Sequence, residues 1–181
     1  MQIQKEQTTS KAILERMIRI LSRRNYSKME LRRKFSDREQ FPRIYVEQAI
    51  ASLERMGCIS DLRYAEDCIH VYKTRRYGPI RIRRKLQEKG IPQEIIARLM
   101  QDLEEETDQS GENPALDFLQ SRTQRLLSEK DPLKRKAKAL RMLSCRGFSR
   151  IQSWDAVRIW MQSLSPHDSW DPDIQGEDSF S

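Results

Sequence analysis

The sequence predicts an all-α protein, an elongated array of three tandem three-helix repeat units. Only 6 of its 181 residues are glycine, and helix-forming residues dominate between them. Apolar residues recur three and four positions apart, and the alternation typical of strands is absent. The order of caps, prolines and glycines returns after about fifty residues, which indicates an internal repeat.

The first repeat is predicted over residues 10–57. Ser10 is the expected N-cap of its first helix. Ser27 and Glu30 have the spacing of a capping box, in which each side chain bonds a free backbone N–H of the first turn. A third helix is expected to start near Pro42, because proline suits the first turn of a helix, and to end at Gly57.

The second repeat is predicted over residues 58–106 and has the same order of signals. Ser60 and Asp61 can cap its first helix, Pro79 opens the second helix, and Gly90 ends it. Pro92 then opens the third helix.

The two copies align residue by residue. Tyr26 and residues 31–35 lie 51 positions before Tyr77 and residues 82–86. After one extra residue in the first copy, the Phe-Pro pair at 41–42 lies 50 positions before the Ile-Pro pair at 91–92.

The third repeat, predicted over residues 113–164, is more diverged. One helix is expected from Pro114 to about Lys130, a second over residues 132–145, and a third ending near Leu164. Gly147 takes the position of Gly90. The acidic segment 104–113 is interpreted as a linker and the acidic residues 165–181 as a disordered tail. Because such small units bury little apolar surface alone, neighbouring units must pack together.

Charge is distributed unevenly along the chain. The formal net charge is +7, but residues 1–101 carry +11 and residues 113–164 carry +7, whereas residues 102–112 carry −6 and the tail carries −5. A protein with so much positive charge attracts polyanions, and the two candidates are nucleic acid and an acidic protein surface.

The segment YGPIRIRRKL concentrates this charge on one short helix. At about 100° per residue, Ile82 and Leu86 share the inner face and Arg84 points away from it. The first repeat has the same pattern, with Arg33 outermost. This recurrence favours a binding surface over the alternative, a solvated helix face. Tyr77 could stack on a partner or join two helices.

No enzymatic chemistry is predicted. His70 has no second ligand at metal-binding spacing, no glycine-rich phosphate loop is present, and no base accompanies a nucleophile. We therefore expect no catalytic residues, no cofactor and no metal. The three cysteines form no CxxC pair, and the chain has neither an apolar signal core nor a membrane-spanning run. A soluble, cytoplasmic protein is expected.

The segment GCISDLRYAEDCIHVYKTRRYGPIRIRRKLQEKGI, with YSKMELRRKF before it and CRGFSRIQSWDAV after it, resembles the RecX family of bacterial recombination regulators. The resemblance covers about residues 10–163 and is most specific in the middle unit. Cys58 departs from the family pattern, which usually has an aromatic or aliphatic residue there.

The resemblance implies tandem three-helix units and a non-enzymatic protein, expected to be a monomer. It implies binding of the RecA nucleoprotein filament along its groove, with single- or double-stranded DNA as a further partner. It also implies inhibition of RecA ATPase, strand exchange and coprotease activity. The residues that fall in the family's motifs are Arg76, Tyr77, Arg81, Arg83, Arg84 and Lys85 in the middle unit and Arg32, Arg33 and Lys34 in the first.

Two alternatives stay open. Three-helix units with basic second helices are also typical of helix-turn-helix modules that bind DNA directly. If the basic helix of the second repeat is only a solvated face, the binding surface is expected around Lys134, Lys138 and Arg141 of the third repeat.

Overall fold

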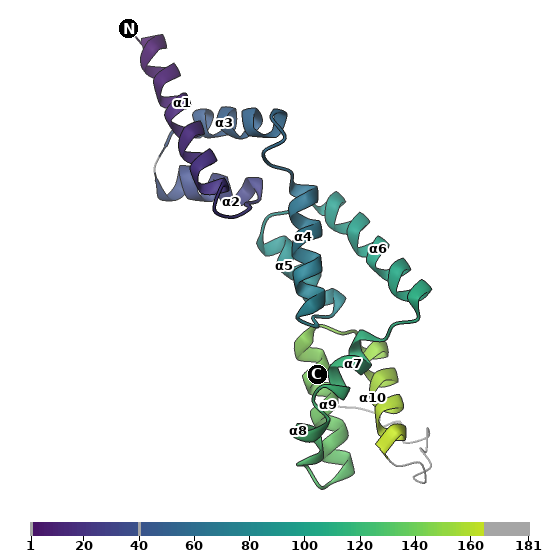
Figure 1. Ribbon diagram of the computed structural model, residues 1–181. Coiled ribbons are helices and arrows are strands. Elements are labelled where there is room, and N and C mark those ends of the chain that lie inside the picture. Colours follow the sequence, from purple (N-terminus) through teal and green to yellow (C-terminus); the bar gives the residue numbers. More distant parts are fainter. Residues whose placement is uncertain (1, 40, 165–181) are drawn as a thin grey trace, which may run out of the picture. The chain divides into compact units, whose positions relative to one another are not determined.

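The computed structural model describes the backbone of residues 2–39 and 41–164, and the side chains of these residues except 2–9 and 38. This part of the chain is entirely helical, without a strand, which confirms the all-α prediction (Figure 1). The predicted tail lies outside the described residues. In chain order the helices are α1 (Gln2–Leu21), α2 (Lys28–Arg32), the π-helix η1 (Arg33–Arg38), α3 (Arg43–Arg55), α4 (Asp61–Thr74), α5 (Pro79–Glu88), α6 (Gln93–Ser110), α7 (Pro114–Gln120), α8 (Thr123–Leu127), α9 (Pro132–Arg146) and α10 (Arg150–Leu164).

The chain divides into two compact units. The first contains residues 1–75 and 82–109, and the second contains residues 76–81 and 110–181. The division passes through α5, whose first turn belongs to the second unit. The boundaries that the sequence predicts for the three repeats and the tail stay predictions.

Part of the first compact unit is organised around an apolar core from α1, α2, η1 and α3. Ile13, Met17, Leu31 and Phe35 are fully buried in it. The N-cap predicted at Ser10 is wrong, because α1 already begins at Gln2. The preceding segment contains no proline or glycine, so nothing in it stops the helix.

The capping box at the start of α2 is confirmed. The Glu30 backbone N–H donates to Ser27 Oγ at 3.1 Å, and the Ser27 N–H donates to Glu30 Oε2 at 3.2 Å. The helix then widens into η1, where the Glu39 N–H donates to the Lys34 carbonyl at 3.1 Å, a bond that spans five residues. This wide turn lies where the first copy has one residue more than the second.

The second copy follows its predicted signals closely. Ser60 caps α4, Pro79 opens α5, and Gly90 follows α5 with φ +70°. The acidic segment 104–113, interpreted as a linker, is helical over most of its length because α6 continues to Ser110, and the boundary between the two compact units falls within it, after Gln109. Glutamate is a good helix former, and Glu106 in this segment pairs with Lys73 of α4 at 2.8 Å.

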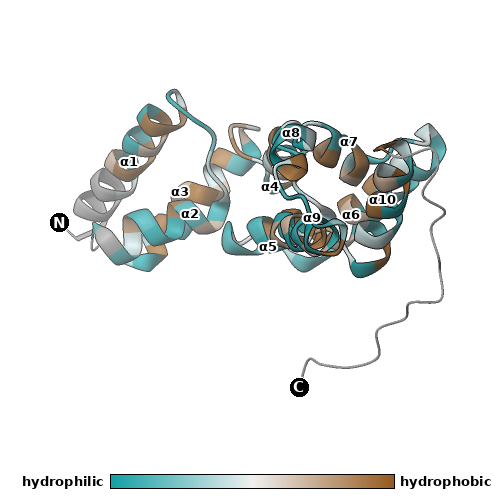
Figure 2. Ribbon diagram, turned by 90° about the horizontal axis from the view of Figure 1, so that it is seen from below, coloured by the Kyte–Doolittle hydropathy of each residue, from teal (hydrophilic) through white to brown (hydrophobic). Residues whose placement is uncertain are grey.

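The second compact unit has its own core, in which α7, α8, α9 and α10 enclose Trp160 and Phe118. The single helix predicted from Pro114 to about Lys130 is instead α7 and α8, broken after Gln120. The hydroxyl of Ser121 donates to the Phe118 carbonyl at 2.7 Å, and such bonds compete with a continuous helix. Apolar and hydrophilic stretches alternate along the helices of both units (Figure 2). No helix in the described ranges has the length and apolar character of a membrane span.

Candidate binding surface

Helix α5 has the orientation predicted from its sequence. Ile82 and Leu86 are 1% and 0% exposed, whereas the side chain of Arg84 is 64% exposed. Both Arg84 and Lys85 approach Glu88 within the same helix, at 3.5 Å and 2.7 Å. The outward charge of α5 is therefore partly neutralised by its own carboxylate.

Arg83 is the exception on this helix. Its side chain is partly exposed and makes neither an ion pair nor a hydrogen bond with any other residue that the structure describes. Its charge is thus available to a partner.

The corresponding cations of the first repeat also have intramolecular partners. Arg32 forms a two-pronged ion pair with Glu47, with N–O distances of 2.7 Å and 3.0 Å. The guanidinium of Arg32 lowers the pKa of the Glu47 carboxyl and outweighs the opposing effect of its burial. Lys34 lies 3.7 Å from Glu39. Arg33 is exposed and donates to the Glu88 carbonyl at 3.3 Å.

Arg76, Tyr77 and Arg81 serve a different purpose in the structure. Arg76 has φ +56° and donates to the Asp117 carbonyl at 3.3 Å. Arg81 donates to the Cys145 carbonyl at 2.7 Å, and its guanidinium lies 4.3 Å from the centre of the Tyr77 ring. All these contacts lie within the second compact unit.

These residues belong to what we call the second joint, the contact of residues 76–81 with the turn after α9. The Gly78 N–H donates to the Arg146 carbonyl at 2.9 Å, and the Ile80 N–H donates to the Gly147 carbonyl at 3.1 Å. A Cβ added at Gly78 would lie 2.4 Å from the Gly147 backbone. The glycine of the YG motif is therefore required by this close approach.

The first joint is the contact of the α2 N-terminus with α4 and with the turn after α5, all within the first compact unit. The Ser27 hydroxyl donates to the Lys89 carbonyl at 2.6 Å, and the Lys28 N–H donates to Asp61 Oδ1 at 2.9 Å. Glu30 accepts from Lys89 Nζ at 2.7 Å and from the Tyr64 hydroxyl at 2.9 Å.

Glu30 is the electrostatic centre of the first joint. Burial opposes its ionisation, but the bonds from Lys89, the Ser27 N–H and Tyr64 together lower its pKa. Burial and the bond to the Glu30 carboxylate raise the pKa of Tyr64 in turn. Asp61 and Tyr64, which belong to the motif that opens the second repeat, thus hold two repeats together.

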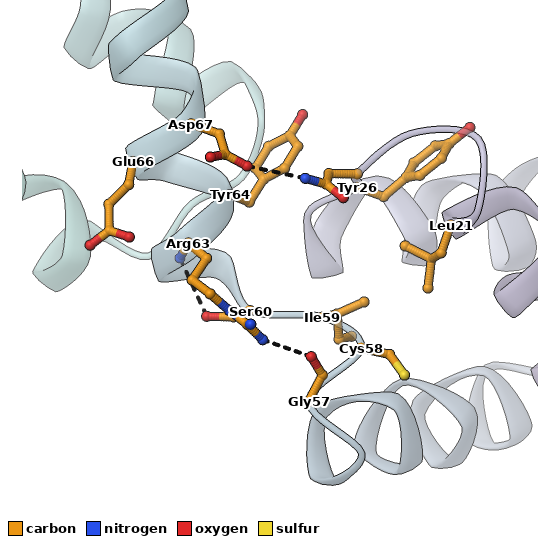
Figure 3. A pocket seen from close by; sticks show the side chains of 11 residues that line it. Leu21, Tyr26, Gly57, Cys58, Ile59, Ser60, Arg63, Tyr64, Glu66 and Asp67 are labelled. Carbon is orange, nitrogen blue, oxygen red and sulfur yellow. Dashed lines mark hydrogen bonds between the residues drawn. The ribbon is translucent and has the colours of Figure 1, made fainter.

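A cavity of about 450 Å³ lies beside the first joint, lined by residues of the turns after α1 and α3 and of α4 (Figure 3). Asn25 donates to Asp67 at 3.1 Å across it, and Arg63 folds back onto the Gly57 carbonyl at 2.6 Å. With Glu66 and Asp67 in its wall, the cavity is a poor site for a phosphate.

The third repeat contains the cationic surface predicted above as the alternative to α5. Lys134, Lys138 and Arg141 occupy one face of α9, and we call them the α9 basic face. Their spacing of four and three residues places them next to one another on the helix surface. In the described chain no group of histidine, cysteine and acidic residues is arranged to hold a metal ion.

Comparisons with known proteins define the class of this fold. A family model described as RecX, second three-helix domain, matches residues 60–100. The chain is similar to a crystal structure of RecX from Lactobacillus salivarius, with a TM-score of 0.72 at 19% identity, covering 85% of this chain and 97% of that one. The class is therefore that of helical proteins built from RecX-type three-helix domains.

Sequence relatives identify the family. The regulatory protein RecX of one Thermus thermophilus strain is 32% identical over 142 residues, which cover 78% of this chain and 87% of the relative. The regulatory protein RecX of Deinococcus radiodurans is 30% identical over 158 residues, covering 87% and 72%. The chain belongs to the RecX family, whose curated members are named regulatory proteins, and the resemblance predicted from the sequence is confirmed.

Proposed function

We propose that this protein is a non-enzymatic regulator that binds the RecA–DNA filament and inhibits RecA ATPase, strand exchange and coprotease activity. It acts as a cytoplasmic monomer. Membership of a family of regulatory proteins carries this proposal. The outward cations of α5 support it further, since a filament of acidic protein and bound DNA would attract them.

The nine residues predicted to bind the filament stay predictions, but their contacts rank them. Arg83 and Arg84 are expected to contribute most, because Arg83 has no partner among the described residues and Arg84 is well exposed. Arg81 and Tyr77 are expected to contribute mainly by keeping the second joint intact.

The test is RecA ATPase activity on single-stranded DNA, with this protein added after the filament has assembled. We expect inhibition at less than one copy per RecA subunit, because blocking one growing end or interrupting one groove affects many subunits. Inhibition only at amounts that coat the DNA, fully relieved by excess DNA, would instead favour the direct DNA-binding alternative.

A matched pair of variants tests the surface itself. Arg83→Ala, Arg84→Ala and Lys85→Ala combined should leave folding nearly intact, because exposed substitutions usually change stability by about 0.5 kcal/mol or less each. Inhibition should require at least tenfold more protein. The control removes the same charge from α3 and α6 with Arg43→Ala, Arg55→Ala and Arg98→Ala. Equal losses in both variants would show that only total charge matters.

A further inference from the structure

Helix α9 has the largest excess of basic residues among the described helices. Its 15 residues include six basic and no acidic ones, whereas α5 has four basic residues and Glu88. The cations of α9 therefore lack the carboxylate that α5 supplies within its own turns.

The α9 basic face lies opposite the core. At about 100° per residue, Lys134, Lys138 and Arg141 fall within roughly 60° of one another, and the buried Ala139 and Leu143 lie on the other side. The three charges are distributed over about 10 Å of helix axis, since each residue advances the helix by about 1.5 Å.

These three side chains have no acidic partner within the described chain. Lys134 and Arg141 make neither an ion pair nor a side-chain hydrogen bond with another described residue, and Lys138 donates only to the Arg125 carbonyl, at 3.0 Å. The nearby carboxylate of Asp131 accepts from the backbone N–H groups of Leu133 and Lys134.

We propose that the α9 basic face binds the phosphate backbone of nucleic acid directly, independently of any contact that α5 makes. Three uncompensated cations in a row match a linear polyanion in charge and spacing. The remaining residue of this face is Cys145, which is exposed.

An acidic protein surface is the less suitable occupant. Protein interfaces depend on buried aromatic or aliphatic anchors, whereas α9 contains no aromatic residue and its exposed Leu133 lies about 100° around the helix from Lys134, off the α9 basic face. Because α9 has no aromatic residue on which a base could stack, binding should not depend on base identity.

The test measures binding of the full-length protein to fluorescently labelled oligo-dT and oligo-dA, without RecA, by anisotropy over a range of salt. Lys134→Ala, Lys138→Ala and Arg141→Ala combined should weaken binding at least tenfold at low salt. Each lost single-strand phosphate contact lowers the log–log salt slope by about 0.7, so the triple variant should lose about 2. A fourfold rise in salt should therefore weaken the unchanged protein roughly twentyfold more than the variant.

Two controls make the result specific. The matched variant Arg43→Ala, Arg55→Ala and Arg98→Ala, which removes the same charge from α3 and α6, should bind DNA within threefold of the unchanged protein. The charge-conserving variant Lys134→Arg, Lys138→Arg and Arg141→Lys should retain binding, which separates charge from damage to the fold.

A thiol footprint provides a second measurement. DNA should slow alkylation of Cys145 at least fivefold and leave alkylation of the exposed Cys58 unchanged. Equal weakening by the matched α3 and α6 variant and by the α9 variant would overturn the proposal, as would DNA protection of both thiols. Binding of polyglutamate in preference to DNA would overturn it in favour of an acidic protein partner.

Discussion

The two joints use equivalent positions of the repeat and different chemistry. Ser27 and Gly78 are 51 positions apart. Ser27 donates to the Lys89 carbonyl and Gly78 donates to the Arg146 carbonyl, and each acceptor directly precedes the glycine at the end of the second helix of the following repeat. In the first joint the donor is a hydroxyl, and a partly buried charge at Glu30 adds to it. In the second joint the donor at this position is the backbone N–H of Gly78, the Ile80 N–H adds a second backbone bond, and the Arg81 side chain donates to the Cys145 carbonyl.

The two joints therefore lie at equivalent positions of the repeat but are formed by different hydrogen-bonding groups. A side-chain joint should respond to pH and to substitutions that change hydrogen bonding. A joint with backbone hydrogen bonds should be destabilised by any added side-chain atom that separates the two main chains. Each of the following predictions separates these two responses.

The largest effect is expected at the second joint. Gly147 has φ +86°, and a Cβ there would lie 2.4 Å from Arg81 Cβ and 2.5 Å from its backbone N. Gly147→Ala combines left-handed strain of about 1–2 kcal/mol with overpacking of about 1–3 kcal/mol. We expect it to lower the free energy of unfolding by about 2–5 kcal/mol, measured by urea denaturation.

Substitutions at two other glycines distinguish backbone strain from overpacking as the cause of the lost stability. Gly111 has φ +64° with no atom within 4 Å of an added Cβ, so Gly111→Ala should cost only the strain, about 1 kcal/mol. Gly78→Ala should cost mainly the overpacking. Equal losses at Gly147 and Gly111 would show that the second joint does not depend on backbone approach.

A smaller effect is expected at the first joint. Glu30→Gln removes the charge that accepts from Lys89, Tyr64 and the Ser27 N–H, and should destabilise the protein by about 1–3 kcal/mol. The control is Glu54→Gln, which removes a half-exposed ion pair with Lys28 and should cost less than about 1 kcal/mol. A loss at Glu30 no larger than at Glu54 would mean that the partly buried charge of Glu30 adds nothing.

The smallest effect is the pH dependence of the same substitution. The folded-state pKa of Glu30 is lowered, so its contribution is complete above the unfolded pKa near about 4.3 and is lost as the pH falls through the lower folded value. The stability difference between the unchanged protein and Glu30→Gln should therefore be constant from pH 7 to about 5 and shrink below about pH 4. Denaturation at a series of pH values measures it. A difference that stays constant down to pH 3 contradicts the assignment.

Local signals predicted most of the fold. The capping box at Ser27 and Glu30, Pro79 at the start of α5 and Gly90 after it are all where the sequence put them. The errors come from segments without a strong stop signal. Acidic residues after position 103 were interpreted as a linker, but glutamate propagates a helix as readily as it solvates a loop.

The candidate site was harder to predict, because sequence spacing gives the direction of a side chain and not its partner. The outward directions of Arg33 and Arg84 were predicted correctly. That Arg32 pairs with Glu47, or that Arg81 bonds the Cys145 carbonyl, depends on residues 15 and 64 positions away. A motif shared with a family therefore indicated joints of the fold as readily as contacts with a partner.

The π-helix η1 has a consequence for how such a protein changes over generations. Copies of a repeat diverge by gaining or losing residues as well as by substitution, and a single added residue normally rotates everything after it by about 100°. Here the bond from Glu39 to Lys34 takes up the surplus residue, and α3 still begins after Pro42 with Val46 and Ile50 in the core. A difference of one residue between two copies of the repeat is thus accommodated as a local change of helical pitch, without a new loop.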